Sequence, residues 1–331
     1  MTANLFEEVP LPTIPAVAIR VLELLAKPDV STAEIADVVQ TDPAITARIL
    51  RAANSPAYGG RKVDSVDRAI VWLGRFATKS LALTFSLARC TQEGGALKRY
   101  FERYWLQSVV HATTMEWLAA KLDRSFRGTA FVSGLLMDVG CLALLQNRTN
   151  LYAPLLDRAR REERRLADVE LNEFGRTHAE LSSELLSGWS LPEVMVDVAR
   201  YHELAPKQLP SLRGHACFGQ LAAANVAVAT GDLLCGTSRM EPFRRLEQLT
   251  TELYGFSDSQ LEEFLSLVSA RLEETSDLLC TDTSSIPPTA EILARAREQL
   301  ARLSEPNAEC ALPDGNTPMP RVAAELMSVR G

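Results

Sequence analysis

The stretch Gly134-Leu135-Leu136-Met137-Asp138-Val139-Gly140-Cys141 is an apolar helical segment that delivers one carboxylate, Asp138, to a glycine turn. Helical patterns before and after it carry three of the four histidines of the chain: His111, His178 and His202. Histidine and aspartate side chains from separate helices around one core can hold a divalent metal. The pattern predicts that these side chains converge. The alternative for each histidine is a core position with a local hydrogen-bond partner.

Composition places the chain among ordinary globular proteins. Its 331 residues are 47% hydrophobic and 23% charged, with a net charge of -7, which argues against a basic protein that wraps nucleic acid. The N-terminal residues 1–15 lack the pattern of a signal peptide, and Asn225, Gly231 and Asp232 interrupt the apolar run 221–235, which we interpret as a buried helix. No pair of the six cysteines has metal-ligand or redox spacing; they stand at 90, 141, 217, 235, 280 and 310. We interpret them as free thiols of a cytoplasmic protein.

Helix signals recur along the chain and strand signals are nearly absent, which predicts an all-α fold. Ser31 and Glu34 form a capping box, and Asp42 with Pro43 supplies an N-cap followed by proline at the first helical position. Ser65 and Gly74 bracket a short helix that carries Ala69, Ile70 and Leu73. We divide the chain into an N-terminal helical lobe (1–92), a helical core (93–235), a helical C-terminal extension (236–304) and a flexible tail (305–331).

Several linked motifs resemble the HDOD domain, the HD-related output domain of bacterial signalling proteins. They are Leu11-Pro-Thr-Ile-Pro15, Asp42-Pro43-Ala44, Arg48-Ile-Leu-Arg-Ala-Ala-Asn-Ser55, Ala69-Ile-Val-Trp-Leu-Gly74 and Tyr201-His202-Glu203. The resemblance covers roughly residues 10–229. It implies an N-terminal helical lobe packed on a core similar to that of the HD phosphohydrolases.

The resemblance also implies that the metal site of the active HD enzymes is degenerate here. Their first ligand matches His111, their His-Asp doublet is Met137-Asp138, and their distant aspartate matches Asn225. The cyclic di-GMP phosphodiesterase branch has a lysine after the doublet, and this position is Cys141 here. That branch also has two added histidines, which match His178 and His202; the residue beside His202 is Glu203. A thioether and a neutral amide are poor ligands for a hard ion that must activate water.

From this mapping we expect no catalytic residue, no cofactor and no tightly bound metal. Any adventitious zinc or nickel would bind His111, Asp138, His178 and His202. We expect Asp138 instead to accept a hydrogen bond from a neighbouring histidine and to raise the pKa of that histidine.

A second pattern has the outline of a helix-turn-helix. It runs from Ser31 to Arg51, with Arg48 and Arg51 on the second helix and Arg61 and Lys62 nearby. A recognition helix presents its N-terminal residues to the bases, and here these are Asp42, Pro43, Ala44 and Ile45, which are acidic and apolar. We therefore favour two packed helices of the N-terminal lobe, and expect no sequence-specific DNA binding and no membrane contact.

These observations predict a non-enzymatic regulatory or scaffolding module that contacts protein partners in bacterial signal transduction. Two alternatives stay open: a metal-dependent phosphohydrolase acting on a nucleotide or cyclic dinucleotide, and a DNA-binding regulator. The sequence does not name a partner or a small-molecule ligand. A buried face containing Ile49, Leu50, Ile70 and Leu73 is expected to pack the N-terminal lobe against the core.

Overall fold

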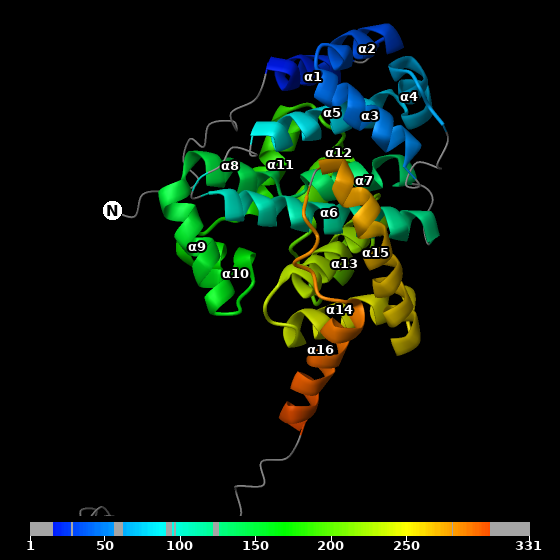
Figure 1. The fold of residues 1–331 in the computed structure, drawn as a ribbon. Helices are drawn as coiled ribbons and strands as arrows, with labels where there is room; N and C mark the ends of the chain where they lie inside the picture. The colour runs from blue at the N-terminus through cyan, green and yellow to red at the C-terminus, as the bar shows by residue number, and fades with distance from the viewer. Residues whose placement is uncertain are drawn as a thin grey trace, which may run out of the picture.

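A computed structural model describes residues 16–27, 29–55, 62–90, 95, 97–121, 126–279 and 281–304. These residues form helices and no strands, which confirms the all-α prediction (Figure 1). The motif at 11–15, the tail at 305–331, and Arg61, Cys280 and Cys310 lie outside them.

Five helices form the first group along the chain. They are α1 (Ala16–Ala26), α2 (Thr32–Gln40), α3 (Pro43–Asn54), α4 (Val66–Leu73) and α5 (Arg75–Cys90). The predicted caps are present: Ser31 and Glu34 form the capping box of α2, Asp42 caps α3, and Gly74 ends α4 with a φ of 88°. In Figure 1 this group lies above the long central helix α6 (Lys98–Lys121), and α5 contacts α7 (Arg127–Leu136).

The expected buried face is correct at Ile49, Ile70 and Leu73 and wrong at Leu50. Ile49 and Ile70 are fully buried, whereas Leu50 is only half-buried against the edge of the core. Leu50 follows Ile49 directly, and successive residues of a helix point about 100° apart, so with Ile49 facing the core Leu50 lies at its edge.

Replacing Ile49 with alanine is therefore expected to lower the free energy of unfolding by about 2–5 kcal/mol, because a cavity is left in a fully buried site. Leu50→Ala is the matched control, with the same side-chain volume removed from a half-buried site and a smaller expected loss. Urea denaturation of both variants measures the difference. Equal losses would contradict the assignment of Ile49 to the core.

The central helices follow α6 along the chain. They are α7, α8 (Val139–Asn147), α9 (Thr149–Arg161), α10 (Leu166–Phe174), α11 (His178–Gly188), α12 (Glu193–Tyr201), the short 3-10 helix η3 (Leu209–Leu212) and α13 (Phe218–Cys235). Of these helices, α7, α8 and α13 pack directly against α6. The apolar run 221–235, interpreted from the sequence as a buried helix, lies within α13. Two apolar stretches, 129–147 and 218–235, have the length and hydropathy of a membrane span, and 83% and 72% of them are buried inside the fold, as core helices are.

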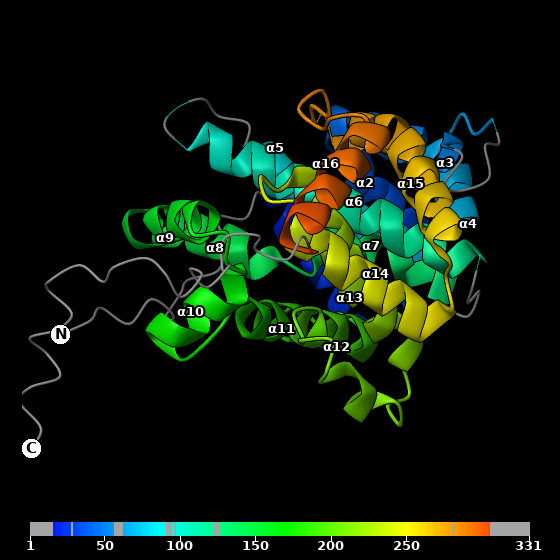
Figure 2. The same cartoon turned by 90° about the horizontal axis from the view of Figure 1, so that it is seen from below.

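Three further helices complete the described chain: α14 (Met240–Tyr254), α15 (Asp258–Leu279) and α16 (Thr289–Ser304). All three lie within the segment 236–304 that the sequence predicts to be helical. Seen from below, α14 and α15 lie across α13 and α6 (Figure 2), and the Trp117 ring of α6 lies 5.0 Å from the Phe264 ring of α15. The extension thus shares the apolar core of the central helices.

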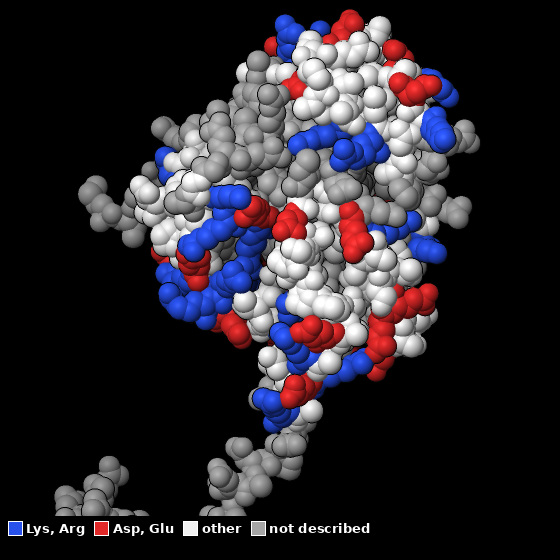
Figure 3. Space-filling model, in the orientation of Figure 1, with Lys and Arg blue, Asp and Glu red and all other residues white. Residues whose placement is uncertain are grey.

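The surface is mixed in charge. Figure 3 shows Lys and Arg interspersed with Asp and Glu, with basic side chains gathered around α9. There Arg158 pairs with Glu173, and Arg161 and Arg164 lie 3.9 and 3.7 Å from Glu162. These arginines are partnered by carboxylates rather than free to neutralise phosphates.

Candidate functional site

Asp138 occupies the junction between α7 and α8. Its neighbours Met137 and Val139 are fully buried, and this apolar anchoring holds the carboxylate inside the core with 15% of the side chain exposed. The expected glycine turn is wrong: Gly140 is helical, within α8, and its N–H donates to Ser182 Oγ at 2.8 Å. A glycine is needed there because a Cβ would lie 2.4 Å from the carbonyl oxygen of His178.

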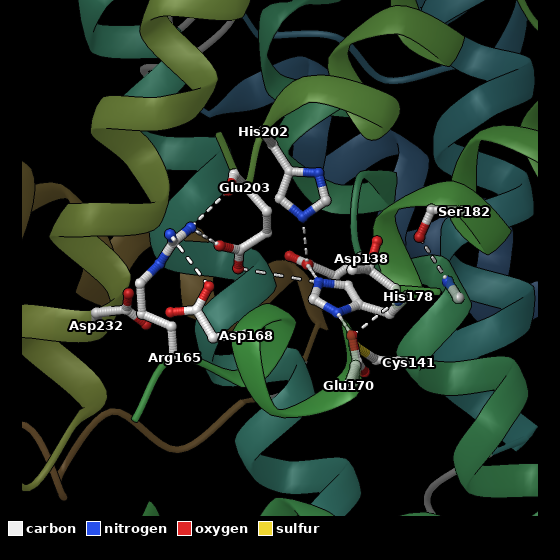
Figure 4. Close-up of polar contacts among 12 residues, drawn as sticks. Asp138, Cys141, Arg165, Asp168, Glu170, His178, Ser182, His202, Glu203 and Asp232 are labelled. Carbon is white, nitrogen blue, oxygen red and sulfur yellow. Dashed lines mark hydrogen bonds and ion pairs between the residues drawn. The ribbon is translucent and has the colours of Figure 1, made fainter. Parts of the chain in front are cut away.

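Three histidines converge on the Asp138 carboxylate, as the sequence predicted. Figure 4 shows two of them, His178 and His202, beside Asp138. His111 Nδ1 lies 3.0 Å from Oδ2, while His202 Nε2 and His178 Nε2 lie 2.9 and 3.3 Å from Oδ1. They reach it from the middle of α6, the first residue of α11, and the position just after the end of α12. Burial would raise the pKa of Asp138, but the His202 charge and these hydrogen bonds hold it well below the ordinary value.

A fully buried glutamate supports one of the histidines from behind. Glu170 Oε2 lies 2.7 Å from His178 Nδ1 and accepts the His178 backbone N–H at 2.8 Å, while Oε1 accepts the Tyr152 hydroxyl. Burial would lower the pKa of His178, but Cys141, Glu170 and the hydrogen bond to Asp138 outweigh burial and raise it well above the ordinary value. The Cys141 Sγ atom lies 3.1 Å from the Tyr152 hydroxyl oxygen, and burial raises the pKa of Cys141 to about 11.

Glu203 closes the other side of the cluster. Arg165 Nη2 donates to Glu203 Oε2 at 2.5 Å and to the Glu203 carbonyl oxygen at 2.6 Å. Burial would raise the pKa of Glu203, but the charges of Arg165 and Arg245 lower it to about 2. Asp232 lies 3.5 Å from Arg245, and burial together with the Glu203 charge raises the pKa of Asp232.

The hydrogen-bond directions impose a charge condition on this cluster. Both ring nitrogens of His178 face carboxylate oxygens, and His202 faces the Ala199 carbonyl with Nδ1 and Asp138 with Nε2. A neutral imidazole donates from only one nitrogen, so each ring needs either a second proton or a cation between Nε2 and Asp138. The cluster also lacks two positive charges. It contains two guanidinium groups against four carboxylates, namely Arg165 and Arg245 against Asp138, Glu170, Glu203 and Asp232.

The ligand set of the active HD enzymes does not fit a metal here. Met137 stands in place of one histidine. His111 Nε2 has no hydrogen-bond partner among the described residues and points at Gly231, where a Cβ would lie only 2.4 Å away. Asn225 donates both amide hydrogens to the carbonyl oxygens of Tyr201 and Leu221, each at 2.9 Å, and so joins α13 to the end of α12.

A displaced set of candidate ligands consists of His178, His202 and Glu203, with Asp138 bonded to both histidines. His178 Nε2 lies 3.9 Å from Glu203 Oε1, and the candidate ligand atoms of His178, His202 and Glu203 lie within 4.8 Å of one another. Each histidine has its Nδ1 on a buried oxygen, as metal-binding histidines do. Either one divalent ion or the protonation of both imidazole rings would supply the two missing positive charges.

The sequence analysis missed Glu170, Arg165 and Tyr152. Glu170 shares its helix face with Ala167 and Phe174, three before and four after it, and a carboxylate on an apolar face was the available signal. Arg165 belongs to a run of mixed charge that resembles an ordinary solvated surface, so nothing local distinguished it.

A family model for the HDOD domain matches residues 11–205. The chain belongs to the HDOD family. The resemblance to the HDOD domain inferred from the motifs is thereby confirmed. Solved structures similar to this chain include proteins from Geobacter sulfurreducens and Marinobacter aquaeolei VT8.

The Geobacter sulfurreducens structure, an HDOD domain protein of unknown function, is 23% identical, with a TM-score of 0.56, covering 82% of this chain and 92% of that one. The Marinobacter structure is provisionally named a signal transduction protein; it is 22% identical, with a TM-score of 0.55, over 85% and 61% of the two chains. A Shewanella amazonensis SB2B structure provisionally named a phosphohydrolase is 21% identical, with a TM-score of 0.60, over 84% and 98%. These likenesses establish the HDOD fold.

A curated relative, an uncharacterized protein of Treponema pallidum, is 21% identical over 200 residues, which are 59% of this chain. The HDOD chain described here spans 38% of the length of that relative.

Proposed function

We propose that this HDOD protein is a non-enzymatic regulatory or scaffolding module of bacterial cytoplasmic signalling that acts through protein contacts. The observation that carries the proposal is the saturation of Asp138: both carboxylate oxygens are engaged by histidines. A carboxylate so engaged fixes α6, α11 and α12 relative to one another, and is not free to bind substrate or activate water.

Hydrolysis is the less supported alternative. It needs a metal ion that lowers the pKa of a bound water, and the HD ligand set lacks its second histidine and its distant aspartate. The displaced set of His178, His202 and Glu203 is the observation that favours it, because these three groups could hold an ion beside Asp138.

Duplex recognition through α2 and α3 is also less supported. Asp42 and Pro43 occupy the start of α3, and Asp42 uses its carboxylate to cap the backbone N–H groups of Ala44 and Ile45. The Arg48 guanidinium lies 5.8 Å over the Phe85 ring rather than extending outward. Protein contact fits this lobe better, since Val71 and Trp72 of α4 are 77% and 38% exposed.

The test pairs metal analysis of protein purified without an affinity tag with assays on cyclic di-GMP and simple phosphate esters. We expect no stoichiometric magnesium, manganese or iron and no turnover. The control is Asp138→Asn, which should leave both readings unchanged. One metal per chain, together with turnover that this substitution abolishes, would replace the regulatory proposal with the phosphohydrolase.

A further inference from the structure

A second cluster of metal-ligating side chains lies where α13 begins, apart from the Asp138 site. Asp197 of α12 faces His215 and Cys217, which belong to the turn that leads into α13. The Cys217 Sγ atom lies 3.3 Å from His215 Nδ1 and 3.9 Å from Asp197 Oδ2, and His215 Nε2 lies 3.6 Å from the same Oδ2. His215 and Cys217 follow the residues that match the family model, so the HDOD assignment does not account for this cluster.

The spacing suits a tetrahedral ion. Zinc bonds of about 2.3 Å to sulfur and about 2.0 Å to nitrogen or oxygen place neighbouring ligand atoms roughly 3.3–3.6 Å apart. Each of the three residues offers one ligand atom, and these atoms lie within 4.8 Å of one another. A single nitrogen of His215 serves as ligand, so the three side chains would have to close in by up to about 1 Å to share one ion.

The same residue types could instead form a nucleophilic triad, in which the histidine stands between thiol and carboxylate and the thiol loses its proton readily. The His215 ring does lie between them, with Nδ1 toward the sulfur and Nε2 toward Asp197. The Asp197 carboxylate also lies 3.9 Å from the sulfur, however, and burial together with the Asp197 charge raises the pKa of Cys217 to about 11, the opposite of an activated thiol. A negative charge next to the sulfur opposes a free thiolate but stabilises a bound cation.

We propose that Asp197, His215 and Cys217 form a binding site for a zinc-type transition metal ion that ties the start of α13 to α12. The thiolate, imidazole and carboxylate are donors that Zn²⁺ accepts together. The side chains of His215 and Asp197 are 32% and 17% exposed, so the ion reaches the site from solvent. Water completes the fourth position, or Glu193 does, one turn before Asp197 on the same helix and exposed.

Cobalt(II) titration of the full chain, purified untagged and stripped with a chelator, tests the site. Cobalt substitutes for zinc and gives a thiolate-to-cobalt charge-transfer band in the near ultraviolet when sulfur is a ligand. We expect this band to saturate at one equivalent and zinc to bleach it. Cys217→Ser should abolish the band, and His215→Ala should weaken cobalt binding by more than about 100-fold, the upper cost of losing only a ligand's hydrogen-bond partner.

Two cysteine variants serve as matched controls. Cys235→Ser alters a thiol elsewhere on α13, and Cys141→Ser alters the thiol beside His178; both should keep the band. Serine is a favourable N-cap residue, so Cys217→Ser should retain the start of α13, which circular dichroism checks. No band in the wild type, a band that survives Cys217→Ser, or one lost with Cys141→Ser would overturn the proposal. Rapid, zinc-insensitive alkylation of Cys217 at neutral pH would also overturn it, in favour of a reactive thiol.

Discussion

Gly140→Ala is expected to destabilise the HDOD core by about 3 kcal/mol or more. The added Cβ would lie 2.4 Å from the His178 carbonyl oxygen and 2.9 Å from the Ser182 backbone nitrogen. Both are backbone atoms of α11, so no rotamer change relieves the clash, and α8 must move away from α11. Overpacking costs typically 1–3 kcal/mol and sometimes more, while the better helix propensity of alanine returns only about 1 kcal/mol.

The same movement would disturb the candidate site, because Gly140 lies two residues after Asp138 and His178 begins α11. The matched control is Gly188→Ala at the exposed end of α11, where no atom lies within 4 Å of the added Cβ. This control should be neutral or stabilising. Denaturant unfolding compares the two, and similar stabilities would show that α8 and α11 are not in close contact.

The second large effect is expected at Asp138. Asp138→Ala should lower the free energy of unfolding by about 3–5 kcal/mol, since removing one partner of a buried charged network leaves the others uncompensated. His178 would then face Glu170 on one side only, and His111 and His202 would lose their bonds to the carboxylate. Asp168→Ala is the control: this carboxylate is 55% exposed and 3.9 Å from Arg165, a pairing expected to contribute little.

The pH dependence gives an independent reading of the same network. The folded-state pKa of Asp138 lies well below its ordinary value, so its contribution is present above about pH 4 and is lost as the pH falls further. Asp138→Asn lacks this proton uptake. Its stability should therefore fall less steeply with acidification than that of the wild type, as urea unfolding between pH 5 and pH 2 would measure. Parallel curves would contradict the assigned role of the Asp138 charge.

The prediction of the helices depended mainly on local capping signals. The capping box of Ser31 and Glu34, the Asp42 cap and Gly74 act within four residues along the chain, so the sequence displays them directly. Where such signals were weak, the sequence indicated helix without its bounds, as at α14, which has no side-chain hydrogen bond at its N-cap residue Arg239. Leu50 shows the limit of the apolar pattern, because hydrophobicity alone did not distinguish a core position from its edge.

The sequence by itself determined the all-helical class, the HDOD family, and the set of histidines around Asp138, because these depend on residue identity and local spacing. Only the tertiary structure decided that Glu170 is buried behind His178, that Gly140 is a point of helix contact, and that Asp197 meets His215 and Cys217. Those facts depend on which helix faces pack together over long sequence separations. A carboxylate or cysteine looks the same in the sequence whether solvent, an imidazole or another helix lies opposite it.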